Sequence, residues 1–336
     1  MNRSQRILAS ALLGTAALGA VLYFTYRSRA AQTGAMPGLM TLAPADAPVL
    51  LYADVAALRA APFFQRLLAA APMPQMDPEY MEFIRETGFD YTRDLDRVLG
   101  IGWTGSSVSN GLVIAEGRFD RAKLSSYARR KGRVESHNGI EVYIEPLRGT
   151  RAGTTAAFAF LDDHRIAFGE LSRLETLLTA RDSSGPSAAM RERVRRVAGS
   201  AVLVVAKADS LPQNVSAGGL RSDQLDNLTR SLRWVSLGAR PEGDRLDMAV
   251  EGECDTPENA QQLAGTLDGL RMVGQAALAD PQTQQRMDPQ LVAWLDALLR
   301  VLNVSREDQR VRLTLQLTGE MMDRFPANSA RSTPSR

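Results

Sequence analysis

An uncharged segment near the start of the chain constrains its organisation more than any other feature. Residues 7–26, ILASALLGTAALGAVLYFTY, carry no charge and follow Arg3 and Arg6. A helix rises about 1.5 Å per residue, so a segment of this length spans about 30 Å, the thickness of the hydrocarbon core of a bilayer. Aromatic residues gather at its end, where membrane proteins place rings at the interface. We therefore predict one transmembrane helix, forming an N-terminal membrane anchor over residues 1–29.

Two other interpretations of this segment stay open. A buried core helix is disfavoured by the terminal position and the basic flanks. A cleaved signal peptide would use Ser28 and Ala30 as the small pair before the cut, but the apolar run exceeds the core of a usual signal peptide, which favours a retained signal-anchor. Arg27 and Arg29 nearly balance the positive charges ahead of the segment. Because a short tail precedes a long body, we expect a single-pass inner-membrane protein with a periplasmic or extracellular C-terminal body.

The composition of the chain is that of a folded and nearly neutral protein. Hydrophobic residues make up 44% and charged residues 23% of the 336 positions, as in ordinary globular domains. The chain has 40 basic and 38 acidic residues, whereas a nucleic-acid partner would require a basic excess on one face. The one cysteine, Cys254, cannot form an intramolecular disulfide. We expect no nucleic-acid partner.

Glycine- and proline-containing segments, together with a weak internal similarity, indicate how the rest of the chain is divided. Residues 49–58 (VLLYADVAAL) match residues 202–211 (VLVVAKADSL), and VIAEGRFD at 113–120 matches MAVEGECD at 248–255. The second match keeps a Glu-Gly pair, at Glu116 and at Glu251, which we interpret as a structural strand end. We predict an internal repeat of two related halves. The expected order is an anchor at 1–29, a tether at 30–44, α+β halves at 45–185 and 186–325, and a disordered tail at 326–336.

Local patterns predict the elements of each half. Asp120 and Asp255 should each cap a helix, and Asp-Pro pairs at 77–78 and 288–289 should start two more. Residues 139–146 and 154–170 read as antiparallel strands, and 310–319 alternates polar and apolar residues as a half-buried strand does. Hairpins with helices packed on one side indicate an α+β fold with antiparallel sheets rather than a doubly wound parallel sheet.

A glycine motif at residues 100–105 matches the dinucleotide-binding pattern G-x-G-x-x-G. That chemistry requires a helix that starts at the glycines, so that its amides face a pyrophosphate. Here the turn signal Asn110–Gly111 and the strand-like run LVIAEG follow instead. We interpret the motif as part of a β-hairpin and predict no cofactor.

Potential catalytic or metal-binding residues are few. Asp162, Asp163 and His164 are consecutive and point in different directions, and the only other histidine is His137. A polar β-turn explains the triplet. Cys254 has no histidine nearby in sequence and reads as a small buried hydrophobe rather than a thiol nucleophile. We therefore predict no catalytic, cofactor-binding or metal-binding residue.

Two basic runs have a possible role at a membrane surface. They lie at 129–133 and 191–196, and the second alternates with Met190, Val194 and Val197 as a solvated helix face would. Arginines there could touch anionic headgroups of a nearby bilayer. Exposed arginines require no such partner, so both readings remain.

Two segments resemble a group of bacterial proteins. LAPADAPVLLYADVAALRAAPFFQRL at 42–67 and FAFLDDHRIAFGELSRLETLL at 158–178 are similar to segments of membrane-anchored bacterial cell-envelope proteins of unknown function, whose bodies are duplicated and α+β. The chain departs from their pattern because no lipoprotein cysteine follows the anchor. The resemblance implies a place in the envelope and an architecture, and it implies no site residue.

These observations predict a membrane-anchored extracytoplasmic module that binds or scaffolds an envelope protein or lipid and is not an enzyme. Two alternatives remain. One is a cryptic hydrolase or metal-dependent enzyme whose ligands come from distant strands. The other is an assembly factor that positions a membrane complex. A groove or apolar patch between the halves, without clustered titratable residues, is expected for the binding module.

Overall fold

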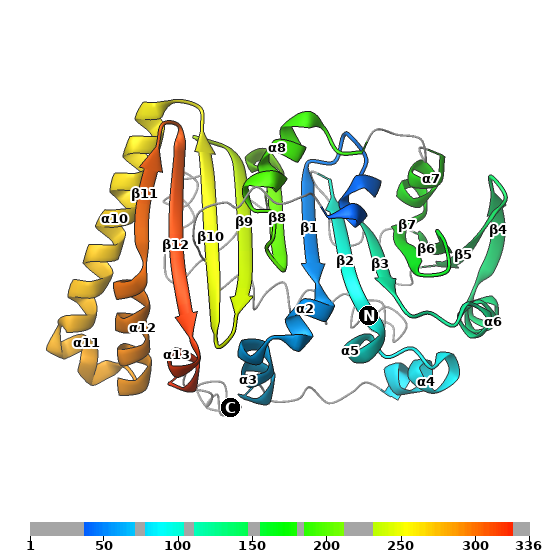
Figure 1. Ribbon diagram of the computed structural model, residues 1–336, viewed down its shortest axis with the longest axis horizontal. Coiled ribbons are helices and arrows are strands. Elements are labelled where there is room, and N and C mark those ends of the chain that lie inside the picture. Colours follow the sequence, from blue (N-terminus) through cyan, green and yellow to red (C-terminus); the bar gives the residue numbers. More distant parts are fainter. Residues whose placement is uncertain are drawn as a thin grey trace, which may run out of the picture.

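The fold is built on one large antiparallel sheet. A computed structural model describes residues 37–70, 78–103, 111–146, 155–179, 185–211 and 231–324. Its sheet has the order β11-β12-β10-β9-β8-β1-β2-β3-β7-β6-β5-β4, with α10 and α12 beside the β11 edge and β4 at the other edge (Figure 1). The strands are β1 (Val49–Asp54), β2 (Leu95–Gly102), β3 (Leu112–Gly117), β4 (Arg133–His137), β5 (Ile140–Pro146), β6 (Thr155–Phe160), β7 (Arg165–Glu170), β8 (Val202–Lys207), β9 (Leu232–Glu242), β10 (Arg245–Cys254), β11 (Asn303–Glu307) and β12 (Arg310–Thr318).

The helices are short except for one. They are η1 (Gly38–Leu42), α2 (Val55–Ala60), α3 (Pro62–Ala70), α4 (Pro78–Thr87), α5 (Tyr91–Asp94), α6 (Arg121–Lys131), α7 (Leu171–Thr179), α8 (Ala188–Arg196), η3 (Ala208–Ser210), α10 (Pro257–Ala279), α11 (Pro281–Arg286), α12 (Pro289–Val301) and α13 (Gly319–Asp323). Together with the antiparallel sheet they confirm the predicted α+β class. No helix among them has the length and hydropathy needed to cross a bilayer. The predicted anchor at 1–29 lies outside the described residues.

Strand β1 lies at the centre of the sheet, between β2 and β8. Leu50 faces Ile101 across one boundary and Val205 across the other. The segments matched in sequence occupy corresponding places, because β1, β2 and β3 run outward in one direction and β8, β9 and β10 in the other. Such an order would follow from a duplicated half. The duplication and the boundary at residues 185 and 186 stay predictions.

The two faces of the sheet are covered by different helices. We call the face to which Leu50, Leu99 and Leu203 point face A, and the opposite face, with Ala53 and Val202, face B. Most helices pack on face B, as the prediction of helices on one side requires. They are α2, α3, α12 and α13 over the middle of the sheet and α4, α6 and α10 farther out. Three further helices, η1, α7 and α8, pack on face A instead. Apolar side chains on both faces of the central strands explain this second layer.

Helix starts follow the polar residues that precede them. The amide of Lys123 donates to Oδ1 of Asp120 at 3.0 Å, and the amide of Gln290 donates to Oδ1 of Asp288 at 2.7 Å. Both caps were expected. The cap of α10 is Thr256 rather than Asp255, because the Thr256 hydroxyl accepts from the amide of Asn259. A side chain at the N-cap position satisfies an amide that the helix leaves free.

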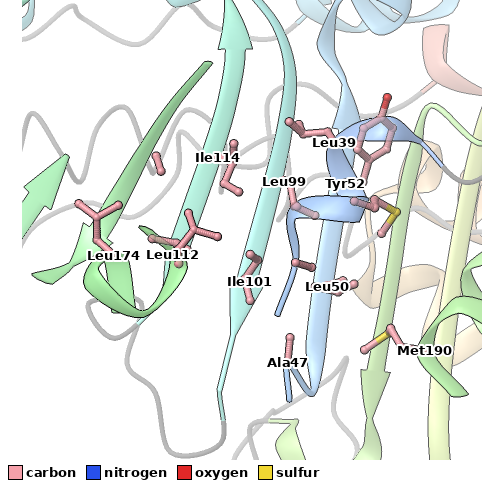
Figure 2. Packing of buried hydrophobic residues seen from close by; sticks show 14 of the residues in the cluster. Leu39, Ala47, Leu50, Tyr52, Leu99, Ile101, Leu112, Ile114, Leu174 and Met190 are labelled. Carbon is pink, nitrogen blue, oxygen red and sulfur yellow. The ribbon is translucent and has the colours of Figure 1, made fainter. Parts of the chain in front are cut away.

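The end of the segment predicted as a tether, 30–44, is part of the folded body. Leu39 and Met40 of η1 and Ala43 after it are buried in the main core on face A. Figure 2 shows Leu39 above the ends of β1 and β2, close to Tyr52 and Leu99. The body therefore begins before residue 44, since apolar side chains in a glycine- and proline-rich segment can still enter a core.

Candidate functional site

The candidate site is a hollow of about 720 Å³ on face A, where the central strands end. Pro37 and Leu39 form one side, the ends of β1, β2 and β3 form the floor, and the 199–201 loop with β9 closes the other side. Helix η1 covers the apolar part of face A and leaves this end of the strands open. The position is between strands of the first and second predicted halves, where a groove was expected.

A row of charged residues crosses the floor of the hollow. Asp54 on β1 pairs with Arg97 on β2, Arg97 with Glu116 on β3, and Glu116 with Arg165 on β7. Residues that face one another in neighbouring strands share one face of the sheet. The register therefore places side chains of alternating charge side by side. The expectation of a site without clustered titratable residues was wrong, because strand ends far apart in sequence meet here.

The charges of this row bind one another. Arg97 Nε lies 3.5 Å from Oδ2 of Asp54, and its Nη1 contacts Glu116. Arg165 donates from Nε to Oδ2 of Asp162 at 2.6 Å. One guanidinium, that of Arg97, thus serves two carboxylates, while Arg165 has a carboxylate of its own.

Tyr52 lies under the row at the edge of the main core. Its ring is buried, and in Figure 2 its hydroxyl points away from the other labelled side chains. Burial, helped by the negative charge of Asp54, raises the pKa of Tyr52 to about 12. The phenol therefore remains protonated at physiological pH and can donate a hydrogen bond.

Arg240 on β9 forms the opposite end of the hollow. It donates from Nε to the carbonyl oxygen of Gly199 at 2.9 Å and from Nη2 to that of Ala198 at 3.2 Å. Gly199 has φ of +81°, and a Cβ there would lie 2.6 Å from the Arg240 guanidinium. A glycine is thus required for both the turn and the approach of the arginine. Among the described residues, no carboxylate lies within ion-pair distance of Arg240.

A second hollow of about 550 Å³ adjoins the first and shares Glu116 and Arg165 with it. It collects Asp96, Asp162, Asp163 and His164. The amide of His164 donates to Oδ1 of Asp162 at 2.9 Å, as in the polar turn that was predicted. No three histidine, cysteine or carboxylate side chains converge on a metal position in the described part of the chain.

The remaining candidate residues lie elsewhere. His137 on the edge strand β4 contacts Glu135 and Glu175, each at 3.4 Å, and does not line either hollow. Cys254 is fully buried, and burial raises the pKa of its thiol, which confirms its interpretation as a small hydrophobe. Gly100 and Gly102 lie inside β2, antiparallel to β3, as the hairpin interpretation requires. Residues 104–110 lie outside the described residues.

The interpretation of 191–196 as a solvated face was wrong for two arginines. Arg193 contacts Glu253 and stacks over Trp234 at 4.4 Å, and Arg196 donates to Oε1 of Glu251 at 2.9 Å. Both arginines are largely buried. The helical period places them on a face that meets β10, and a sequence cannot distinguish water from a carboxylate-bearing strand as the neighbour of such a face.

The other basic run is exposed but paired. Each of its basic residues contacts a carboxylate, on a neighbouring element or, for Arg133, on the same strand, and this pairing reduces the attraction of the run for anionic headgroups. The pairs are Arg129 with Glu141, Arg130 with Glu86, Lys131 with Glu82 and Arg133 with Glu135.

No family model and no curated protein matches the chain. Solved structures of the Treponema protein TP0453 are similar to it at low identity. Its crystal form IV aligns with a TM-score of 0.47 and 12% identity over 84% of this chain and 94% of that one. Crystal form I aligns with a TM-score of 0.43 and 12% identity over 87% of this chain and 96% of that one. Likeness at this level assigns no function to this chain.

Proposed function

We propose that the chain is a membrane-anchored extracytoplasmic module that binds an envelope protein or lipid and performs no catalysis. The observation that carries the proposal is the hollow on face A, whose charged row crosses four strands. A volume near 720 Å³ is within the range of small-molecule and headgroup sites.

The chemistry of the row supports recognition rather than proton transfer. The carboxylates of Asp54 and Glu116 contact the Arg97 guanidinium, and a phenol with a raised pKa stays protonated and cannot act as a base near neutral pH. Asp54 and Glu116 therefore offer acceptors at positions fixed by Arg97, and Tyr52 offers a hydrogen-bond donor. Fixed polar groups of this kind orient a ligand and give specificity.

The position of Pro37 supports a site close to the membrane. Pro37 lines the hollow, and the predicted transmembrane segment ends at Tyr26, eleven residues before it. A fully extended chain of that length reaches about 38 Å. If residues 7–26 span the bilayer, the hollow is tethered within this distance of its surface.

Site-directed photocrosslinking in whole cells tests the proposal. A photoreactive residue at Ala57, which lines the hollow, should give adducts with an envelope protein or lipid, whereas one at the exposed Leu68 on α3 should not. Protease added to spheroplasts should digest the C-terminal body. Equal adducts at the two positions, or a body that is shielded from the protease, would refute the proposal.

The second hollow favours one alternative, a metal-dependent enzyme, because it brings His164 together with Asp96, Asp162 and Asp163. Metal analysis of the purified full chain separates the two functions. The binding module predicts no stoichiometric metal. Zinc present at one equivalent and lost in a His164→Ala variant would instead establish the alternative.

A further inference from the structure

The first hollow has two ends of opposite charge. At one end Arg240 donates to backbone carbonyl oxygens and makes no ion pair with a carboxylate among the described residues. Asp247, which faces it on β10, instead accepts from Gln316 at 2.7 Å and lies 4.0 Å from Arg245. At the other end Asp54 and Glu116 share the single guanidinium of Arg97, which leaves negative charge in excess. Arg165 adds no net charge because it binds Asp162. The hollow is therefore dipolar along the direction that crosses the strands.

The separation of the two ends suits a small ligand. Arg240 is on β9 and Asp54 on β1, with β8 between them. Neighbouring strands lie about 4.8 Å apart, so the backbones of these residues are about 10 Å apart, and their side chains reach into the space between. Ser200 and Tyr52 line the same hollow and bring hydroxyl groups that can donate to an anion.

We propose that this hollow binds a zwitterionic headgroup of a membrane lipid, with its phosphate toward Arg240 and its ammonium toward Asp54 and Glu116. The inference rests on the proposed function and names the ligand class of the same site. A guanidinium binds phosphate strongly, and paired carboxylates accept from an ammonium group. A purely anionic headgroup leaves the carboxylate end without a partner and brings like charges together, which lowers its affinity.

Proximity to the bilayer favours a membrane lipid, rather than a soluble molecule, as the zwitterionic ligand. Pro37 lies at the rim of the hollow, and the eleven residues back to Tyr26 hold it near the predicted anchor. A tether of this length raises the effective concentration of headgroups at the hollow. A soluble zwitterion, or the charged terminus of a peptide, has the same chemistry without this advantage.

Calorimetric titration of the full chain in non-ionic detergent tests the inference. Glycerophosphoethanolamine should bind saturably. Glycerol phosphate and ethanolamine, which each carry charge of only one sign, should bind at least about tenfold more weakly. Arg240→Gln should weaken binding of glycerophosphoethanolamine by about tenfold. Asp54→Asn, which keeps the N-cap of α2, should weaken binding of the amine-bearing ligands alone.

Arg233→Gln is the matched control, because Arg233 lies on the same strand as Arg240 but is exposed and outside the hollow. Its affinity should stay unchanged. Absence of saturable binding, equal affinity for glycerol phosphate, or tighter binding of a zwitterionic dipeptide would overturn the inference.

Photocrosslinking from Ala57 in liposomes tests whether the bound headgroup belongs to a membrane lipid. Lipid adducts should form in liposomes of phosphatidylethanolamine with phosphatidylglycerol and should be lost in phosphatidylglycerol alone. Adducts of equal yield in both liposomes would refute lipid selection. Protein adducts in cells together with no headgroup binding would reject this inference and leave the binding module standing, whereas failure of both experiments would reject both.

Discussion

Face A changes character between the centre of the sheet and the strands near its β11 edge. Over the middle of β1, β2 and β3, away from the charged row, it is apolar, and Leu50, Leu99 and Ile114 are fully buried beneath η1 and α7. Over β10 and β12 the same face carries Glu251 and Arg312, which pair across the two strands. One pleated surface is thus stabilised by apolar burial in the first region and by paired charges in the second. We call these two regions the apolar end and the charged end of face A.

Helix α8 shows the difference within a single element. Its Met190 and Val194 join the main apolar core, while Arg193 and Arg196 reach Glu253 and Glu251 on β10. An apolar contact tolerates many neighbours, whereas a buried charge is acceptable only opposite its partner. The charged end therefore fixes where α8 sits on the sheet, and the apolar end supplies most of the burial.

Removing one member of the charged end gives the largest expected loss of stability. In Glu251→Ala, Arg196 and Arg312 lose a carboxylate that lies 2.9 and 3.3 Å away. We expect the free energy of unfolding, measured by urea denaturation, to fall by about 4 kcal/mol, because the largely buried Arg312 loses its carboxylate and Arg196 keeps only those of Glu192 and Glu253. Glu307→Ala removes an exposed partner of Arg310 and should cost less than about 1 kcal/mol. Equal losses would mean that the buried cluster is solvated.

A truncation at the apolar end should cost somewhat less. Leu99→Ala removes a fully buried side chain from the main core, and we expect a loss of about 3 kcal/mol in the same measurement. Leu68→Ala, at a leucine that is 61% exposed, provides the control and should change stability by less than about 0.5 kcal/mol. A loss at Leu99 no larger than that of the control would contradict the apolar account of this end.

The matched glycines of the two Glu-Gly pairs allow a direct comparison. A Cβ at Gly117 would lie 2.3 Å from the carbonyl oxygen of Asp94, whereas at Gly252 it would meet the end of the Leu232 side chain at 2.8 Å. A backbone atom cannot move aside as a leucine methyl can. We expect Gly117→Ala to lower the free energy of unfolding, measured by urea denaturation, by about 2 kcal/mol. Gly252→Ala should lower it by about 1 kcal/mol. The reverse order would show that the first strand is the more pliable.

Acid titration gives the smallest expected effect and tests an ion pair in α5, directly before β2 and beside the apolar end. A hydrogen bond from Arg93 lowers the pKa of Asp94 from 3.8 to about 2. A carboxyl whose pKa is lower in the folded state adds stability above its unfolded pKa and loses it as the pH falls through the folded value. Because Arg93 is exposed, we expect a loss of about 1 kcal/mol between pH 5 and pH 2 that Asp94→Asn does not show. An identical pH profile for the variant would show that Asp94 does not cause the loss of stability in acid.

Local chemistry made many elements predictable from the sequence. Asp120 and Asp288 mark helix starts because a carboxylate accepts from the first free amides, and both helices begin as expected. The alternation in 310–319 predicted a half-buried strand because side chains of a strand point to opposite faces. The structure has β12 at 310–318, and its apolar residues meet the helices of face B. Such signals depend on neighbours within a few residues, so one sequence contains them.

The candidate site was not predictable in this way. Asp54, Arg97 and Glu116 belong to different strands, and each alone reads as a polar residue at a strand end. Only the register brings them into one row, and only the burial of η1 beside them defines the hollow. The one signal in the sequence was the repeated Glu-Gly pair, which indicated a structural strand end and gave no partner for Glu116.

The sequence by itself determined the α+β class, the caps and turns of most elements and the apolar nature of residues 7–26, because these depend on the order of residue types along the chain. The tertiary structure decided which charges are buried and with whom. Arg193 and Arg196 have a helical spacing that suits solvent equally well, and only the strand that packs against them supplies Glu253 and Glu251. The energy of a charged side chain depends on the groups within a few ångströms of it. Strand pairing and helix packing between distant parts of the sequence decide which groups those are.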